Sequence, residues 1–177
     1  IRINREVVLD LNGQSVFITS GNTGFRVVDN EFYGSSLTVI DSSKDKTGQI
    51  YSTEAGTTAI NMTGGDVEFS EGRIYGDVGI NNQGSGTVTV SGGTIDGITY
   101  ALTNVGKGKI IVSGGVLNGG INSDIKENVT LLGGKFSVSP ADYVDESKYE
   151  LVQDTYGYYT LKEISQNDIK YSVQDTS

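Results

Sequence analysis

The chain has 177 residues, of which 22 are acidic and 13 basic, and its formal net charge is −9. This negative charge disfavours binding to nucleic-acid phosphates, because long-range repulsion would oppose the approach. The absence of histidine and cysteine excludes a Ser-His-Asp triad, thiol catalysis, disulfides and cysteine-based metal sites within the chain. We therefore expect no cofactor and no metal ion.

Glycine dominates the composition, with 25 glycines against a single proline, while apolar residues make up only 36%. Glycine without proline suits a chain that turns often, and the abundant Thr, Ser, Val, Ile and Tyr are strand and turn formers. No apolar run approaches the roughly 18 residues needed to span a membrane. The composition predicts one all-β domain that does not insert into a membrane.

The first part of the chain opens in an apparent strand and carries an irregular form of a later repeat, L-N-G-Q-S-V at residues 11–16. An inserted loop follows at Asp41–Gly48, D-S-S-K-D-K-T-G, with oxygen-bearing side chains of the kind that calcium prefers. However, Lys44 and Lys46 add positive charge inside this loop, and no glutamate closes it. We interpret it as an ordinary loop.

A phrase recurs four times in the middle of the chain. It reads F-S-E-G-R-I at 69–74, V-S-G-G-T-I at 90–95, V-S-G-G-V-L at 112–117 and L-L-G-G-K-F at 131–136, with spacings of 21, 22 and 19 residues. A second column keeps the same period: A-I-N at 59–61, G-I-N-N at 79–82, A-L-T-N at 101–104 and G-I-N-S at 120–123. Two independent columns at one period indicate a repeat architecture.

Within each unit the apolar residues alternate with polar ones, as Val88 and Val90 do with Thr87 and Thr89. A period of two is typical of a strand. Three short strands and three turns in about 20 residues describe one coil of a parallel β-helix, whose apolar columns are buried by stacking coils about 4.8 Å apart. The glycines would supply positive φ at the bends.

We therefore expect a parallel β-helix of about six coils over residues 1–139. Asn82 and Asn104 occupy matching places, so we expect them to form a turn ladder of side-chain amides. The alternative is a β-sandwich of short strands with Gly-rich hairpins, which does not account for two columns at one spacing.

The C-terminal part breaks the period. Within residues 140–163, Tyr149–Val152 and Tyr158–Leu161 predict a hairpin that turns at Asp154–Gly157. Because the end of a solenoid must hide its open core and strand edge, this segment is the candidate cap. Residues 164–177 read as a linker or as the first strand of a following domain.

Three stretches together carry a resemblance: "VVLDLNGQSVFI", "TVTVSGGTIDGITYALTN" and "LLGGKFSVSPADYV…YELVQDTYGYYTL". They resemble the Gly-rich, right-handed, single-stranded parallel β-helix repeats of Gram-positive bacterial surface proteins, which have a pectin lyase-like fold. The resemblance implies secretion, a place at the cell surface or cell wall, and neighbouring domains of a larger protein. Proteins of this fold include polysaccharide lyases, glycosidases, adhesins and non-catalytic carbohydrate binders, so the fold does not choose among them.

One cluster of charged residues could serve catalysis, namely Asp66, Glu68, Glu71, Arg73 and Asp77. Glycosidases of this shape use several neighbouring carboxylates. The equivalent places in the neighbouring repeats hold no carboxylate, so we interpret the cluster as a solvated face with surface ion pairs. A polysaccharide lyase or a glycosidase is therefore the less favoured hypothesis, and we expect the chain not to be an enzyme.

Four tyrosines, Tyr33, Tyr51, Tyr75 and Tyr100, lie outside the inward columns. Exposed tyrosines can stack on the faces of sugar rings, so these four are the candidate ligand-binding residues. The leading hypothesis is a non-catalytic rigid segment of a secreted bacterial surface protein, acting as a stalk or adhesive module. The alternative is a carbohydrate-binding module that recognises a host or cell-wall polysaccharide through these tyrosines.

Overall fold

The computed structural model describes residues 1–19, 23–29 and 34–165. In this part the chain is all-β, with two single-turn 3₁₀ helices, η1 (Lys126–Asn128) and η2 (Ala141–Tyr143), and no α-helix. Neither helical turn of the described chain has the length and apolar character to cross a membrane. Tyr33 and most of the predicted linker, residues 166–177, lie outside the described residues.

The strands form two sheets. The six-stranded sheet has the order β14 (Val129–Leu131), β12 (Lys109–Val112), β10 (Thr87–Val90), β8 (Asp66–Phe69), β5 (Ser36–Ile40) and β2 (Glu6–Asp10). The eleven-stranded sheet has the order β1 (Arg2–Ile3), β4 (Thr23–Val27), β7 (Thr58–Met62), β9 (Arg73–Asn82), β11 (Thr94–Asn104), β13 (Val116–Ser123), β15 (Lys135–Phe136), β17 (Tyr159–Glu163) and β16 (Tyr149–Gln153). Beside this path, β3 (Ser15–Phe17) pairs with β6 (Gln49–Tyr51), which pairs with β9.

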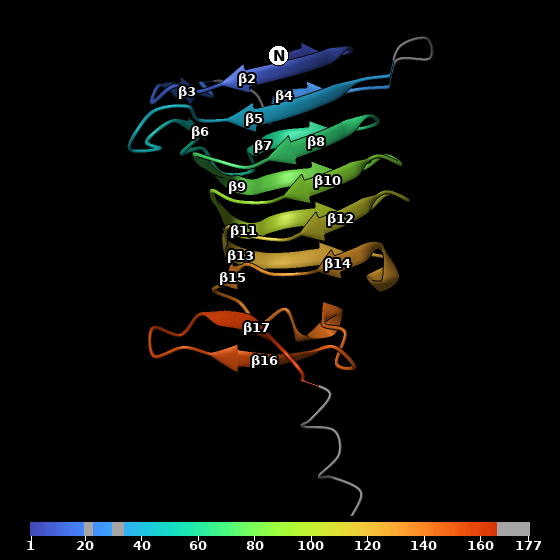
Figure 1. Cartoon of the computed structure of the whole chain (residues 1–177). Helices are drawn as coiled ribbons and strands as arrows, with labels where there is room; N and C mark the ends of the chain where they lie inside the picture. Colours follow the sequence, from blue (N-terminus) through green and yellow to red (C-terminus); the bar gives the residue numbers. More distant parts are fainter. Residues whose placement is uncertain (20–22, 30–33, 166–177) are drawn as a thin grey trace, which may run out of the picture.

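Successive strands from β8 to β15 alternate between the two sheets, so that strands of neighbouring repeats stack in order along the molecule (Figure 1). Val90, for example, lies opposite Phe69 of the preceding repeat and Val112 of the following one. Among the described strands only the β15–β17 and β16–β17 pairs are antiparallel. The predicted all-β class with parallel strands is confirmed and is compatible with a β-helix-like fold, whereas a sandwich would pair its strands antiparallel.

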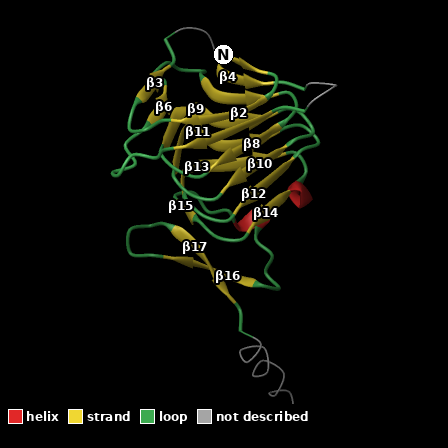
Figure 2. Cartoon of the chain, turned by 45° about the horizontal axis from the view of Figure 1, so that its top comes forward, coloured by secondary structure: helices red, strands yellow, loops and turns green. Residues whose placement is uncertain are grey.

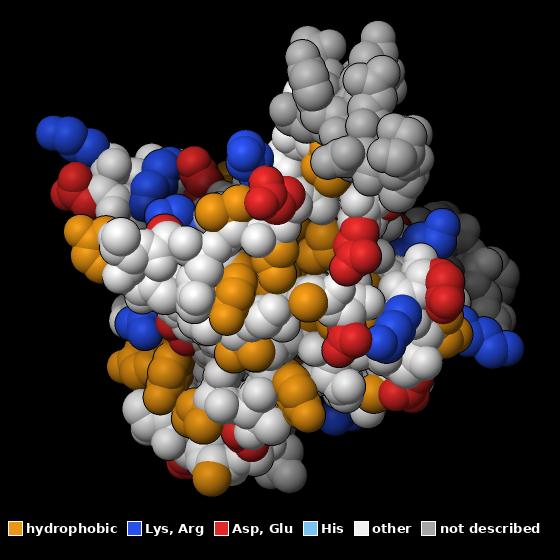
Figure 3. Space-filling view, turned by 90° about the horizontal axis from the view of Figure 1, so that it is seen from below, with side chains coloured by type: hydrophobic (Ala, Val, Ile, Leu, Met, Phe, Trp, Pro, Cys, Tyr) orange, Lys and Arg blue, Asp and Glu red, His pale blue; other side chains and the backbone are white. Residues whose placement is uncertain are grey.

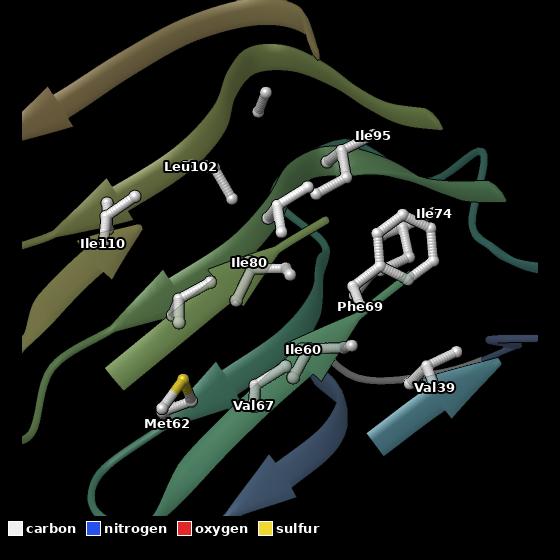
Figure 4. Close-up of a cluster of buried hydrophobic side chains, with 14 of the residues drawn as sticks. Val39, Ile60, Met62, Val67, Phe69, Ile74, Ile80, Ile95, Leu102 and Ile110 are labelled. Atoms are coloured by element: carbon white, nitrogen blue, oxygen red, sulfur yellow. The ribbon is translucent and has the colours of Figure 1, made fainter. Parts of the chain in front are cut away.

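The core follows from the two-residue alternation of the repeats. In β10 the side chains of Val88 and Val90 are buried, while those of the intervening threonines are not. Ile60, Ile80 and Leu102 lie opposite one another on β7, β9 and β11, and all three are fully buried. Figure 4 shows these side chains from successive strands packed in one continuous cluster.

The two glycines of the repeated phrase have different tasks. The second adopts a left-handed conformation, with φ of 68° at Gly93 and 85° at Gly115, which other residues rarely adopt. The first leaves room for the neighbouring backbone, because a Cβ atom at Gly114 would collide with the carbonyl oxygen of Ser91. The glycine pair thus turns the chain while letting adjacent repeats approach closely.

A hairpin ends the described chain, and its two strands correspond to the predicted ones. Strand β17 pairs antiparallel with β15, with Tyr159 opposite Phe136, so it extends the larger sheet by one strand (Figures 1 and 2). Tyr159 and Leu161 are partly buried against the core. Figure 3 views the molecule from this end, where hydrophobic side chains lie among acidic and basic ones.

Two isoleucines allow a matched test of the core. Ile80 is 0% exposed on β9, whereas Ile98 is 63% exposed on β11. We expect Ile80→Ala to lower the free energy of unfolding by about 2–5 kcal/mol, through lost burial and a residual cavity. Ile98→Ala should change it by less than about 0.5 kcal/mol. Denaturant unfolding of both variants measures the difference, and equal effects would contradict the described core.

Candidate functional site

Five neighbouring strands place one outward-facing residue each in register on the outer surface. These residues, here called the outer column, are Phe17 (β3), Tyr51 (β6), Tyr75 (β9), Asp96 (β11) and Asn118 (β13). The residue before each of the last four points into the core, and all four of these apolar neighbours are fully buried. The strand alternation therefore fixes the outer column as a straight row across the strands.

The first half of the outer column is aromatic. The ring centroids of Phe17 and Tyr51 are 4.8 Å apart, with their planes inclined at 39°. The side chain of Phe17 is 46% exposed, which is a large apolar surface to leave in water. The guanidinium carbon of Arg73 lies 5.4 Å from the ring centroid of Tyr75, within range of a cation–π interaction. This half offers a pair of inclined aromatic rings and a third ring with a positive charge beside it.

The second half is polar and internally hydrogen-bonded. Arg73 Nε donates to Asp96 Oδ2 over 2.5 Å, and Asn118 Nδ2 donates to the other carboxylate oxygen over 2.7 Å. The hydroxyl of Tyr158, from the hairpin, donates to Asn118 Oδ1 over 3.1 Å. Because each partner holds the next, this network orients Arg73 at the border between the aromatic and polar halves.

The structure separates the predicted tyrosines. Tyr51 and Tyr75 are brought together in the outer column, whereas Tyr100 lies in another part of β11, opposite Val78 and Gly120. Tyr33 lies outside the described residues. Phe17, which the sequence reasoning did not single out, completes the row. Its signal was local: V-F at 16–17 matches I-Y at 50–51 and at 74–75.

Asn82 and Asn104 are fully buried and lie opposite one another. Each bonds to its own turn, with Nδ2 donating to the carbonyl oxygen of Gly86 (2.7 Å) or Gly108 (2.9 Å). Among the described residues, the only side-chain hydrogen bond from these two amides to a neighbouring repeat joins Asn104 Nδ2 to Ser123 Oγ, over 3.3 Å. Each amide therefore mainly closes the turn of its own repeat.

A row of side chains bonded across the strands lies one residue away, on the outer face. Asn81 Nδ2 donates to Asn61 Oδ1 over 2.9 Å, and Thr103 Oγ1 donates to Asn81 Oδ1 over 2.6 Å. Asn61 Nδ2 in turn donates to Gln83 Oε1 over 3.2 Å. We call these four residues the amide row. It links β7, β9 and β11 by side-chain bonds in addition to their backbone pairing.

The carboxylates of the candidate catalytic cluster bond to different partners. Asp66 accepts the backbone N–H of Thr87, and Glu71 accepts Lys46 Nζ. Asp77 accepts the backbone N–H of Gly56 and the hydroxyl of Thr99. Glu68 is exposed on β8 in the six-stranded sheet, whereas Arg73 lies on β9 in the other sheet and pairs with Asp96. The structure therefore does not bring the cluster together.

The loop at Asp41–Gly48 is held by a buried carboxylate. Asp41 is 0% exposed and accepts three backbone N–H groups, from Gly13 (2.8 Å), Ser43 (3.1 Å) and Gly48 (2.5 Å). Burial raises the pKa of Asp41, but hydrogen bonds from Ser43, Gly13 and Gly48 outweigh it and lower the pKa to about 2. No group of three or more acidic side chains in the described ranges could hold a metal ion.

The stability of the chain should depend on the charge of Asp41. Its native pKa lies below the ordinary 3.8, so its stabilising contribution is complete above about pH 4 and is lost as the pH falls toward about 2. Asp41→Asn leaves a buried backbone N–H facing an amide NH₂ group. This substitution should lower the free energy of unfolding by on the order of 2 kcal/mol at pH 7.

Denaturant unfolding at pH 7 and at about pH 2.5 measures this contribution. The difference between wild type and Asp41→Asn should shrink at the lower pH, where part of the Asp41 contribution is lost. Asp45→Asn, an exposed change in the same loop, is the control and should have little effect at either pH. A difference that stays constant with pH would contradict the role given to the Asp41 carboxylate.

Comparisons with protein-family models, with curated proteins and with solved structures found no match to this chain. The resemblance to bacterial surface repeats therefore stays a prediction from the sequence.

Proposed function

We propose that the chain is a right-handed, single-stranded parallel β-helix of about six coils that serves as a rigid, non-catalytic segment of a secreted bacterial surface protein. The observation that carries this proposal is the unbroken apolar core, whose buried members run from Ile3 to Phe136. In a stack of this kind each repeat packs against its neighbours, and the continuous core makes the segment rigid along the axis of the stack. The hairpin against β15 acts as the cap of the stack.

The use of the acidic side chains supports a structural role. Asp41, Asp66 and Asp77 accept backbone N–H groups from other repeats or turns, and Asp96 accepts Arg73 and Asn118. A retaining glycosidase needs two facing carboxyl groups about 5–5.5 Å apart, flanking the bond to be cleaved. Here these four carboxylates hold strands, turns and side chains in position.

The rigidity of the segment can be measured with spin labels, because the chain has no cysteine of its own. Gln14 and Thr155 are exposed and lie near opposite ends of the strand stack, so Gln14→Cys and Thr155→Cys give one labelled pair. Pulsed electron paramagnetic resonance should give a single narrow distance distribution for the native chain. The same pair in denaturant is the control for a broad distribution. A broad or multiple distribution in the native state would contradict the proposal.

A second proposal, carbohydrate binding, is favoured by the aromatic half of the outer column. The rings of Phe17 and Tyr51 are inclined to each other with their centroids 4.8 Å apart, and Arg73 lies beside Tyr75 as a hydrogen-bond donor. Binding sites for sugars combine such ring faces with a few fixed polar groups. A polysaccharide chain lying along the outer column would meet the rings first and the polar network next.

A glycan array tests this second proposal. The double variant Tyr51→Ala, Tyr75→Ala should lose binding by roughly tenfold or more, the change expected for about 1.4 kcal/mol of lost contact. Tyr100→Ala is the matched control, since the structure places Tyr100 outside the outer column, and it should bind like the wild type. Equal loss in both variants would overturn the assignment of the outer column. Cleavage of a bound polysaccharide would overturn the non-catalytic role.

A further inference from the structure

A groove of about 730 Å³ lies on the larger sheet near its first strands. These strands are β1, β4 and β7, and the groove also uses residues just before β1 and just after β4, β7 and β9. Its lining residues are Ile1, Arg2, Thr23, Gly24, Arg26, Val28, Asn61, Thr63 and Gln83. The groove uses the segment after the end of β9, whereas the outer column uses the beginning of that strand. The two sites are therefore distinct, and the groove is assigned to neither proposed function.

Two arginines stand side by side in this groove. Arg2 on β1 and Arg26 on β4 lie opposite each other in the parallel pairing, and both are exposed. Adjacent strands are about 4.8 Å apart, and like charges directly opposite one another destabilise a sheet. None of the ion pairs formed within the described part of the chain includes either guanidinium. No carboxylate of the described residues therefore pairs with these two positive charges.

The amide row adds further donors at the same place. Asn61 Oδ1 accepts one hydrogen bond from Asn81, and Gln83 Oε1 accepts one from Asn61. The NH₂ group of Gln83 donates none of the side-chain hydrogen bonds found among the described residues. Because Gln83 is exposed and lines the groove, its NH₂ group is the donor that this wall can offer to a ligand.

We propose that this groove binds an acidic oligosaccharide through its carboxylate or sulfate groups. Arg2 and Arg26 would neutralise the anionic group, for which the planar guanidinium supplies paired N–H donors. Gln83 Nε2 and the hydroxyls of Thr23 and Thr63 would contact the sugar oxygens. The volume of the groove falls within the 300–1,000 Å³ typical of small-ligand sites. Because the chain as a whole carries −9, the local arginine pair is what would select the anion.

Isothermal titration calorimetry on the whole chain tests this with three tetrasaccharides. Hyaluronan supplies carboxylates, heparin supplies sulfates as well, and chitin supplies the neutral comparison. We expect one or both acidic ligands to bind, the neutral one to bind at least tenfold more weakly, and affinity to fall as salt rises. Binding by hyaluronan identifies the carboxylate as sufficient, and binding by heparin alone identifies the sulfate as required.

Two double variants with the same change in net charge separate the groove from general attraction. Arg2→Gln, Arg26→Gln should weaken binding of the acidic ligand at least tenfold, whereas Arg5→Gln, Lys109→Gln, both exposed and outside the groove, should leave it unchanged. The thermal midpoint of the first variant should not fall, because it relieves repulsion between like charges.

Three results would overturn the proposal: equal losses in the two double variants, equal binding of neutral and acidic tetrasaccharides, or no binding of either acidic ligand. This proposal and the carbohydrate-binding proposal for the outer column can fail separately, because the two sites share no residue. The double variant Tyr51→Ala, Tyr75→Ala should therefore still bind the acidic tetrasaccharide.

Discussion

The parallel, in-register pairing of each strand with its equivalent in the next repeat is the constraint on which the rest of the structure depends. Because Val90 lies between Phe69 and Val112, and Ile80 between Ile60 and Leu102, equivalent positions of successive repeats meet along these strands. One register therefore builds the apolar core on the inside and straight rows of side chains on the outside. The outer column, the amide row and the arginine pair are three outside rows produced by that single rule.

The same rule explains why the sequence predicts so much of the fold. Two local signals recur in the sequence: the alternation of Val88 and Val90 with threonines, and the glycine pair. Other repeats of the stack carry similar signals. The hairpin was visible because Asp154 and Gly157 are turn residues between two alternating runs. The less regular first strands carry weaker signals, since the inserted loop at 41–48 obscures the period that pairs β3 with β6.

The candidate site was predictable only in part. Tyr51 and Tyr75 each follow a matching isoleucine, so their common face could be inferred from the sequence. Tyr100 lies beyond a register shift in β11, which the repeat pattern does not indicate. The partners of polar side chains were also beyond sequence reasoning. Nothing in the order of residues indicates that Asp96 bonds to Arg73 from one repeat and to Asn118 from another, or that Asp41 would be buried with three N–H groups around it.

The glycine pair of the repeated phrase also bears on how such a chain can change in length. Gly114 lies so close to the carbonyl oxygen of Ser91 that the interval between neighbouring repeats is set there by the main chain, whatever the outer side chains are. A unit that keeps both glycines presents equivalent upper and lower surfaces to its neighbours. Copying or deleting one unit leaves the remaining surfaces matched. Duplication or deletion of one unit can therefore lengthen or shorten the segment, while the remaining outer side chains stay aligned in their rows.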